Sequence, residues 1–429
     1  MKHHHAKEAL DNVLQNPWWS RSWTLQEHVL AQEWAFLCGR ITIPSTLLAL
    51  AVSEIRESGS FIVLFSSFSK RLLFSSEFSQ RRSQASINRL TLELVTLPFH
   101  LETSKPVDKI YSIFSILKLL DIDLPEPDYR KSLEQVYGEV LVALIRAQQN
   151  LALMLYATRW QDTSALPSWV PDWRHPFTIL IDLLGTIYVS PEDGRFDFTS
   201  ACPPGEVFWV DYRPGILRTH GRCLGTMVYS KYGLEVEDTE TAAFVDVCRD
   251  WCQQVEQRVT SYPTGEDIYL AFFKTLMFKR PDFLVFDEQG MAMFYKWVET
   301  MQYPEDPNRQ SAPRGAETLW DKDAFALKFV EMTKGIDGTR LGNIYAIHRY
   351  VYDYTRFHSF SIFDSGYMSL SLLCSRPGDQ VFLIPGSQWP LILRPDGDSY
   401  RFVGPAYVHG VMNGEGWDKA EPLKELHLI

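Results

Sequence analysis

Trp23 and Glu27 are the residues whose types and spacing fit a chemical site most directly. They are four residues apart, so a helix places both side chains on one face, with Arg21 just before them. A partly buried Glu27 could act as a nucleophile or general base, because burial against indole and a nearby guanidinium shift a carboxyl pKa. Trp18 and Trp23 would then contact the substrate. The favoured simpler interpretation is a helix-face salt bridge over a tryptophan core.

A second candidate lies in the sequence LPSWVPDW, residues 166–173. Two prolines and two tryptophans without a regular period predict a rigid loop held by aromatic packing, in which Trp169 and Trp173 could also line a substrate site. Asp172 with His175 could perform acid/base chemistry. A structural corner in which Asp172 accepts backbone N–H groups is the favoured alternative.

The carboxy-terminal region supplies the third candidate, His409, which stands between Val408 and Gly410. Trp389 and Tyr407 could line the mouth of a substrate pocket there. A histidine packed in the core is the more common alternative. Neighbouring polar residues are better explained by strand and turn stabilisation, above all Asp379, with Arg394 and Glu415.

A fourth group of titratable residues has no spacing typical of a metal site. Its members are His348, Arg349, Tyr352, Asp353, Tyr354, Arg356 and His358. Cys248 and Cys252 are one helical turn apart, but no second Cys or His pair follows at zinc-finger spacing, so buried free thiols are favoured over zinc. His3, His4 and His5 resemble a tag remnant and are excluded. We therefore predict no metal and no cofactor.

Composition narrows the classes of protein further. The 429 residues predict roughly two to three domains. A net charge of −11 without a basic run disfavours nucleic acid as a partner. No apolar run reaches the ~18 residues of a membrane span, and the amino terminus lacks the apolar region of a signal peptide, so a cytoplasmic location is expected. Dinucleotide, Walker A, G-x-S-x-G and H-E-x-x-H patterns are absent from the sequence.

The hydrophobic pattern predicts helices followed by strands. Helices are expected at residues 22–36, 44–57, 87–97, 105–120, 132–146, 239–259, 267–278, 289–301 and 322–333. Residues 41–43 read as a short strand, and strands are expected within 179–228 and 349–412, the last part as a meander. The fold class is therefore α+β, with a mainly helical region at 7–176 and a mixed helical and antiparallel-β region at 177–429.

Several stretches together resemble the fungal heterokaryon-incompatibility (HET) domain family. The sequence WSRSWTLQEHVLAQEWAFLCG is similar to the pattern W-S-R-x-W-x-x-Q-E with a Cys-Gly ending. PVDKIYSIFSIL, PDYRKSLEQVY and LPSWVPDW resemble three further segments of that domain. YPTGEDIYLAFFKTL, GDQVFLIPGSQWPLILRP and YRFVGPAYVHGVMNGE resemble the carboxy-terminal region of large HET proteins. The earlier half of a HET domain, with its L-S-Y-x-W-G element, has no counterpart here.

This resemblance implies two different functions. HET domains are considered relatives of the TIR fold, whose NAD hydrolases carry the catalytic Glu in a W-x-x-x-E helix, a spacing that Trp23 and Glu27 match. The chain would then be an incompatibility or cell-death effector, acting by association or NAD cleavage. Alternatively, a HET scaffold without its first half would serve fungal secondary metabolism as a cofactor-independent cyclase, a Diels–Alderase acting on an apolar terpenoid or polyketide. The tryptophan content favours the cyclase.

Overall fold

The computed structural model describes most of the chain in two units. Its longer described ranges are 16–31, 33–38, 40–44, 84–158, 165–175, 200–203, 206–233, 241–278, 347–352, 358–372, 375–418 and 422–429. Unit 1 comprises Met1–Tyr156 with Ser164–Val189, and unit 2 comprises Ala157–Thr163 with Ser190–Ile429. Helices occur together with an antiparallel sheet, which confirms the α+β prediction. The boundary predicted after residue 176 stays a prediction.

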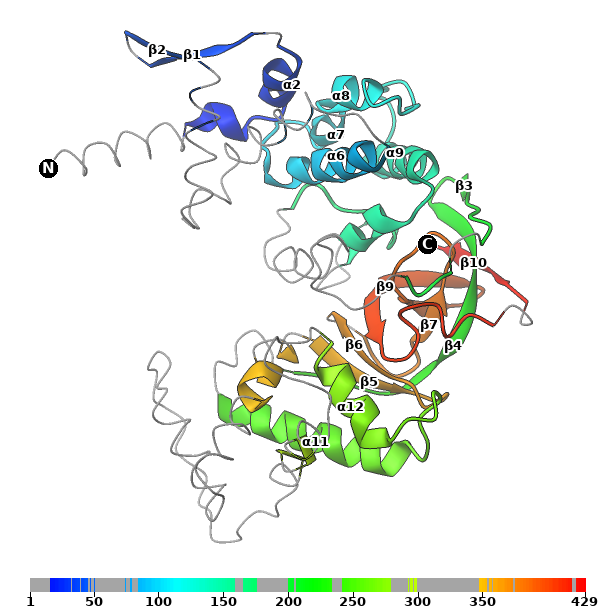
Figure 1. Cartoon of the computed structure of the whole chain (residues 1–429). Helices are drawn as coiled ribbons and strands as arrows, with labels where there is room; N and C mark the ends of the chain where they lie inside the picture. Colours follow the sequence, from blue (N-terminus) through cyan, green and yellow to red (C-terminus); the bar gives the residue numbers. More distant parts are fainter. Residues whose placement is uncertain are drawn as a thin grey trace, which may run out of the picture. The chain divides into compact units, whose positions relative to one another are not determined.

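Unit 1 is mainly helical in its described part (Figure 1). Its elements are η1 (Pro17–Ser20), α2 (Trp23–Leu30), β1 (Ala35–Cys38), β2 (Ile41–Pro44), α6 (Gln84–Thr96), η2 (Leu97–His100), α7 (Asp108–Tyr111), α8 (Phe114–Lys118), α9 (Leu133–Gln148) and η3 (Ala152–Ala157). Helix α9 begins with a capping box: Ser132 Oγ accepts from the Gln135 N–H at 3.3 Å, and Gln135 Oε1 accepts from the Ser132 N–H at 3.1 Å.

The helix predicted over residues 22–36 is shorter than expected. Helix α2 ends at Leu30, because Ala31 adopts an extended backbone with φ −67° and ψ 131°. Residues 35–38 then form β1, which pairs antiparallel with β2. The predicted strand at 41–43 is confirmed as part of β2. Because residues 35–38 pair with β2, their backbone groups are not available for the hydrogen bonds of a continued helix.

Two further secondary-structure predictions, one of a helix and one of a strand, need correction. The single helix expected at 105–120 is divided into α7 and α8, because Ile113 has φ −108° and ψ −2° and its N–H bonds the Ile110 carbonyl. Residues 349–352, expected to lean towards strand, are helical. The predictions at 44–57, 289–301, 322–333 and 179–199 lie mostly or wholly outside the described residues.

Unit 2 contains a sheet that closes on itself. Its strands are β3 (Asp211–Arg213), β4 (Ile216–Tyr232), β5 (His358–Phe363), β6 (Met368–Leu372), β7 (Gln380–Leu383), β8 (Leu391–Asp396), β9 (Ser399–Val408) and β10 (Lys424–Leu428). From β4 the hydrogen bonding runs through β5, β6, β9, β8 and β7, and β7 pairs with β4 again. The predicted meander of β7, β8 and β9 is confirmed.

Strand β4 is the member that makes this closure possible. Its 17 residues are long enough to pair with β10, β7 and β5 in succession along its length. Register shifts next to Gly225 and Val228 bend the strand between its partners. Figure 1 shows β4 running beside the other strands of unit 2. The ring of strands from β4 through β5, β6, β9, β8 and β7 is therefore closed and has no free edge.

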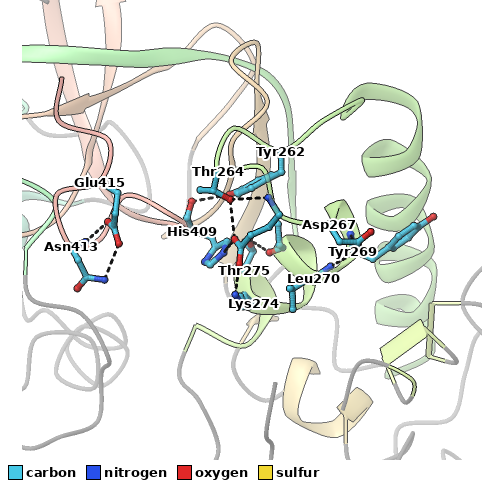
Figure 2. Close-up of polar contacts among 12 residues, drawn as sticks. Tyr262, Thr264, Asp267, Tyr269, Leu270, Lys274, Thr275, His409, Asn413 and Glu415 are labelled. Atoms are coloured by element: carbon cyan, nitrogen blue, oxygen red, sulfur yellow. Dashed lines mark hydrogen bonds and ion pairs between the residues drawn. The ribbon is translucent and has the colours of Figure 1, made fainter. Parts of the chain in front are cut away.

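Two helices, α11 (Thr241–Arg258) and α12 (Ile268–Leu276), cover one face of this sheet. Phe360 of β5 contacts Trp251 of α11 and Phe272 of α12, with ring centroids 5.5 and 5.3 Å apart. All three side chains are fully buried. The loop between the two helices, residues 259–267, thereby lies against the sheet and near the end of β9 (Figure 2).

Candidate functional site

The described residues bring His409 into a polar cluster with Glu266, Lys274 and Tyr407. His409 Nε2 lies 2.7 Å from Glu266 Oε2, and Lys274 Nζ bonds the other carboxylate oxygen, Oε1. On its opposite side, His409 Nδ1 lies 3.5 Å from the Tyr407 hydroxyl. Thr264 donates its hydroxyl to Glu266 Oε2 at 3.0 Å. Figure 2 shows His409 and Lys274 converging from the end of β9 and from α12.

Local structure explains why this loop is fixed. Asp267 caps α12, since its Oδ1 accepts from the N–H groups of Tyr269 and Leu270, both at 3.0 Å. Tyr262 donates its hydroxyl to the His409 carbonyl at 2.8 Å, and its ring stacks on the imidazole at 5.7 Å. Gly410 has φ +83°, a conformation that favours glycine, and a Cβ there would collide with Thr264.

Burial and hydrogen bonding determine which groups of the cluster carry a proton. Burial alone would raise the pKa of Glu266, but hydrogen bonds from Lys274 and His409 outweigh it and lower the pKa to about 2. For His409 burial is the larger effect and lowers its pKa, against the raising effect of Glu266. Both partners therefore favour an ionised carboxylate and a neutral imidazole at pH 7. Nε2–H then donates to Glu266, and Nδ1 presents its lone pair towards Tyr407.

This arrangement has the parts of an acid/base site. A carboxylate on one imidazole nitrogen fixes the tautomer, and the other nitrogen faces a hydroxyl group that it could deprotonate. The His409 side chain is 14% exposed and Glu266 is 26% exposed, and Tyr407 is half-buried. The imidazole is therefore shielded without being sealed from solvent.

Sequence reasoning identified His409 and Tyr407 but missed Glu266 and Lys274. Glu266 precedes the helix cap Asp267 in the sequence TGED, which signals only the start of α12. It lies 143 residues from His409 in the chain, so no local spacing could relate them. The one signal in the sequence that could have indicated this pair is the presence of Lys274 eight residues after Glu266, on the helix predicted at 267–278.

The first candidate, around Glu27, lies on the exposed side of α2. Arg21, Trp23 and Glu27 are exposed, and the Trp23 side chain retains 39% of its surface. The buried side of α2 consists of other residues, Thr24, Leu25, His28 and Val29. The partial burial expected of Glu27 beside the indole of Trp23 is therefore not observed.

Trp18 is half-buried rather than part of a pocket with Glu27. Its ring meets that of Trp19 edge to face at 4.8 Å and that of His28 at 6.4 Å. His28 in turn contacts Trp34 at 4.4 Å. Trp18 therefore belongs to a cluster of aromatic rings around His28, and Glu27 lies on the exposed side of α2.

Trp169 and Trp173 are core residues of unit 1, each 0% exposed. Trp173 donates Nε1–H to the Val95 carbonyl at 2.9 Å and stacks on Phe99 at 6.0 Å. Asp172 accepts from the Arg174 N–H at 3.2 Å, as expected for a structural corner, and also pairs with the Arg174 guanidinium at 2.6 Å. A side chain without solvent-accessible surface does not face a cavity of water size, so these tryptophans do not line one.

In unit 2, Trp389 is 4% exposed, and Asp379 is buried in a bidentate pair with Arg394 at 2.8 and 3.0 Å. Asp379 also accepts from the Arg376 N–H at 2.9 Å, which matches its expected turn role. Glu415 accepts from the Asn413 N–H at 2.7 Å. These residues stabilise the turns that flank the sheet.

In the fourth group, His348, Tyr352 and His358 are buried, whereas Arg349 and Arg356 are half-buried. His348 is fully buried, accepts from Trp297 Nε1 at 3.4 Å, and has its pKa lowered to about 4 by burial. His358 is buried on β5, with its ring 5.5 Å from Phe278. Asp353 and Tyr354 lie outside the described residues. Within the described part, no three His, Cys, Asp or Glu side chains form a group that could hold a metal ion.

The two cysteines of α11 and the apolar character of the described helices bear on two further predictions. Cys248 and Cys252 are buried free thiols, and burial raises the pKa of both. No helix in the described part of the chain combines the length and apolar character needed to cross a membrane.

Comparison with known proteins agrees with the closed sheet. Residues 286–429 match the family described as Het-6 beta-barrel domain. The chain is also similar to Heterokaryon incompatibility protein 6, OR allele, of Neurospora crassa, with 22% identity over 478 residues covering 95% of this chain and 66% of the relative. The chain thus spans just under two thirds of that relative's length. No solved structure matches the chain. A relationship to heterokaryon-incompatibility proteins is supported.

Proposed function

We propose that this chain functions in fungal heterokaryon incompatibility as an effector. The observation that carries the proposal is the similarity to the Neurospora crassa incompatibility protein, which extends over 95% of the chain and so includes both units. The match of residues 286–429 to the Het-6 beta-barrel domain family agrees with it. A single shared module would support only a common fold, whereas similarity along both units supports a common role.

Association, rather than NAD cleavage, is the mode of action that the described residues favour. A catalytic Glu needs an environment that shifts its pKa and excludes water. Glu27 keeps the W-x-x-x-E spacing with Trp23, but both side chains are exposed on α2. An exposed surface of this kind is suited to contact another protein.

The cofactor-independent cyclase stays a prediction. Such an enzyme needs an enclosed apolar site that holds the substrate in a reactive conformation. Trp169 and Trp173 have no accessible surface and Trp23 is exposed, so these three tryptophans, which were expected to contact the substrate, do not support this hypothesis.

A growth assay in Neurospora crassa tests the proposal. The chain is expressed from an inducible promoter in one of two otherwise compatible strains, and the growth rate of the heterokaryon is measured. We expect slowed growth and death of fused cells. Gly221→Val is the matched inactive variant, because a Cβ at Gly221 would lie 2.9 to 3.0 Å from Ile384, Leu383 and Leu426 and disrupt the sheet of unit 2.

Normal heterokaryon growth, at protein levels verified by immunoblot, would contradict an effector role. Purified protein is incubated with NAD in parallel, and nicotinamide is measured. Release of nicotinamide that Glu27→Ala abolishes would replace association by NAD cleavage. Growth inhibition that survives in Glu27→Ala without nicotinamide release is the result expected from association.

A further inference from the structure

The cluster at the end of β9 has a feature that a simple ion pair does not need. Glu266 is already paired with Lys274 and Thr264, so its charge is balanced without His409. His409 nevertheless directs Nε2 at the carboxylate and Nδ1 at the Tyr407 hydroxyl. A histidine held between a carboxylate and a hydroxyl group is the arrangement by which proteins activate an oxygen nucleophile.

We propose that Glu266, His409 and Tyr407 form a nucleophilic site in which the Tyr407 oxygen accepts an acyl group from a thioester or aryl ester. Tyr407 is the nucleophile, His409 is the general base, and Glu266 is a positioning residue that fixes the imidazole tautomer. The assignment is independent of the role in incompatibility and rests on the geometry of unit 2 alone.

The chemical step balances with these groups. Tyr407 Oη attacks the carbonyl carbon while its proton passes to His409 Nδ1. The new C–O bond forms, and the bond from the carbonyl carbon to the leaving sulfur or oxygen breaks. The thiolate or phenolate departs and takes the proton from His409, and the acyl-tyrosine remains. Water can later cleave this ester with the same imidazole as base.

The leaving group determines the substrate class. A phenol has a pKa of about 10, and a thiol has one of about 8.5. Phenolate therefore displaces a thiolate or an activated phenolate readily but displaces an alkoxide or an amine poorly. Alkyl esters and amides are excluded as substrates by this comparison. The 3.5 Å distance between Tyr407 Oη and Nδ1 is long for a hydrogen bond, as is common before a substrate is bound.

The environment of His409 keeps its base form available. The titratable and charged groups that face it in the described residues come from the loop, from α12, from β9 and from the turn after β9: Tyr262, Glu266, Lys274, Tyr407 and Glu415. Burial lowers the pKa of His409 below its usual 6.5. The neutral imidazole therefore predominates at pH 7.

The test uses 4-nitrophenyl acetate with the full chain. Acetylation of individual tyrosines is measured by peptide mapping, which also separates adducts on Lys274. N-acetyltyrosinamide in the same buffer gives the reference rate. We expect Tyr407 to react at least about tenfold faster than this reference, and we expect His409→Gln to reduce its rate to the reference value.

Matched variants distinguish activation of Tyr407 by His409 from a general effect of substitution on the fold. His427→Gln removes a histidine that pairs with Glu425 at 2.9 Å but lies outside the proposed site, and it should leave the Tyr407 rate unchanged. Glu266→Gln should lower the rate, and Glu266→Asp should restore part of it. Circular dichroism verifies folding of each variant.

The pH profile of the unaltered protein provides a second measurement if a variant does not fold. With His409 as base, the Tyr407 rate rises below pH 7 and levels off well before phenol ionisation near pH 10. A rate that instead follows phenol ionisation overturns the proposal. So does a Tyr407 rate equal to the reference, or one unchanged in folded His409→Gln.

Discussion

A fragment limited to the matched residues 286–429 should not fold, because it lacks β4. This strand supplies the pairing partner of β5 and β7 and almost all the pairing of β10. Its removal opens the sheet and creates two exposed edges. The fragment also lacks α11 and α12, whose Trp251 and Phe272 cover Phe360.

The free energy of unfolding that is lost when β4 is removed can be calculated from its strand pairing. Strand β4 has five residue pairs with β10, four with β7 and five with β5. With one ladder hydrogen bond per pair, each worth about 0.5 to 1 kcal/mol, the loss is on the order of 7 to 14 kcal/mol. This equals the whole unfolding free energy of an ordinary domain, which is about 5 to 15 kcal/mol. The lost burial of Phe360 adds to it.

The assay compares fragments 286–429 and 190–429 with the full chain. We expect 190–429 to show a cooperative urea transition and dispersed amide signals in NMR spectra. We expect 286–429 to aggregate, or to bind a hydrophobic dye without a cooperative transition. A monomeric 286–429 fragment with a cooperative transition and protected β5 and β7 amides would refute the essential role assigned to β4.

Three further outcomes are expected. Trp173→Ala should destabilise unit 1 by about 3 to 5 kcal/mol in urea unfolding, since this side chain is 0% exposed, while Trp23→Ala, at 39% exposure, should change stability far less. The pKa of Glu266 is lowered from 4.5 to about 2, so its stabilisation is complete above pH 4.5 and is lost as the pH falls towards 2. After a reduction for solvent screening this is about 1 to 2 kcal/mol, and Glu266→Gln should flatten the acid side of the urea-midpoint profile. Iodoacetamide should label exposed Cys223 in the native protein far faster than buried Cys248, whose pKa is raised by burial; equal mass-spectrometric labelling would contradict this.

Elements with local signals were predictable from the sequence. Ser132 and Gln135 are three residues apart, and their capping box fixes the start of α9 within the pattern itself. The turns between β7, β8 and β9 were likewise marked by glycines and prolines, and this meander is confirmed. These features depend on neighbours within a few residues, so the sequence contains the information in readable form.

Features that depend on distant partners were not predictable. Helix α2 has apolar residues on both sides, with Leu25 and Val29 on one and Trp23 and Leu30 on the other. Periodicity identified the helix but could not decide which side packs inward. The pairing of Glu266 with His409 is the stronger case, since their contact exists only after the α11–α12 loop meets the end of β9.

The closed sheet also has a consequence for protein synthesis. Arg218 of β4 and Glu425 of β10 bond each other at 2.6 Å although 207 residues separate them. At about 5 to 20 residues per second, a ribosome needs about 10 to 40 s to pass from one to the other. Throughout that interval β4 exists without its partner β10. The sheet of unit 2 can be completed only after β10 has been synthesised, so the edge of β4 that β10 covers is exposed until then.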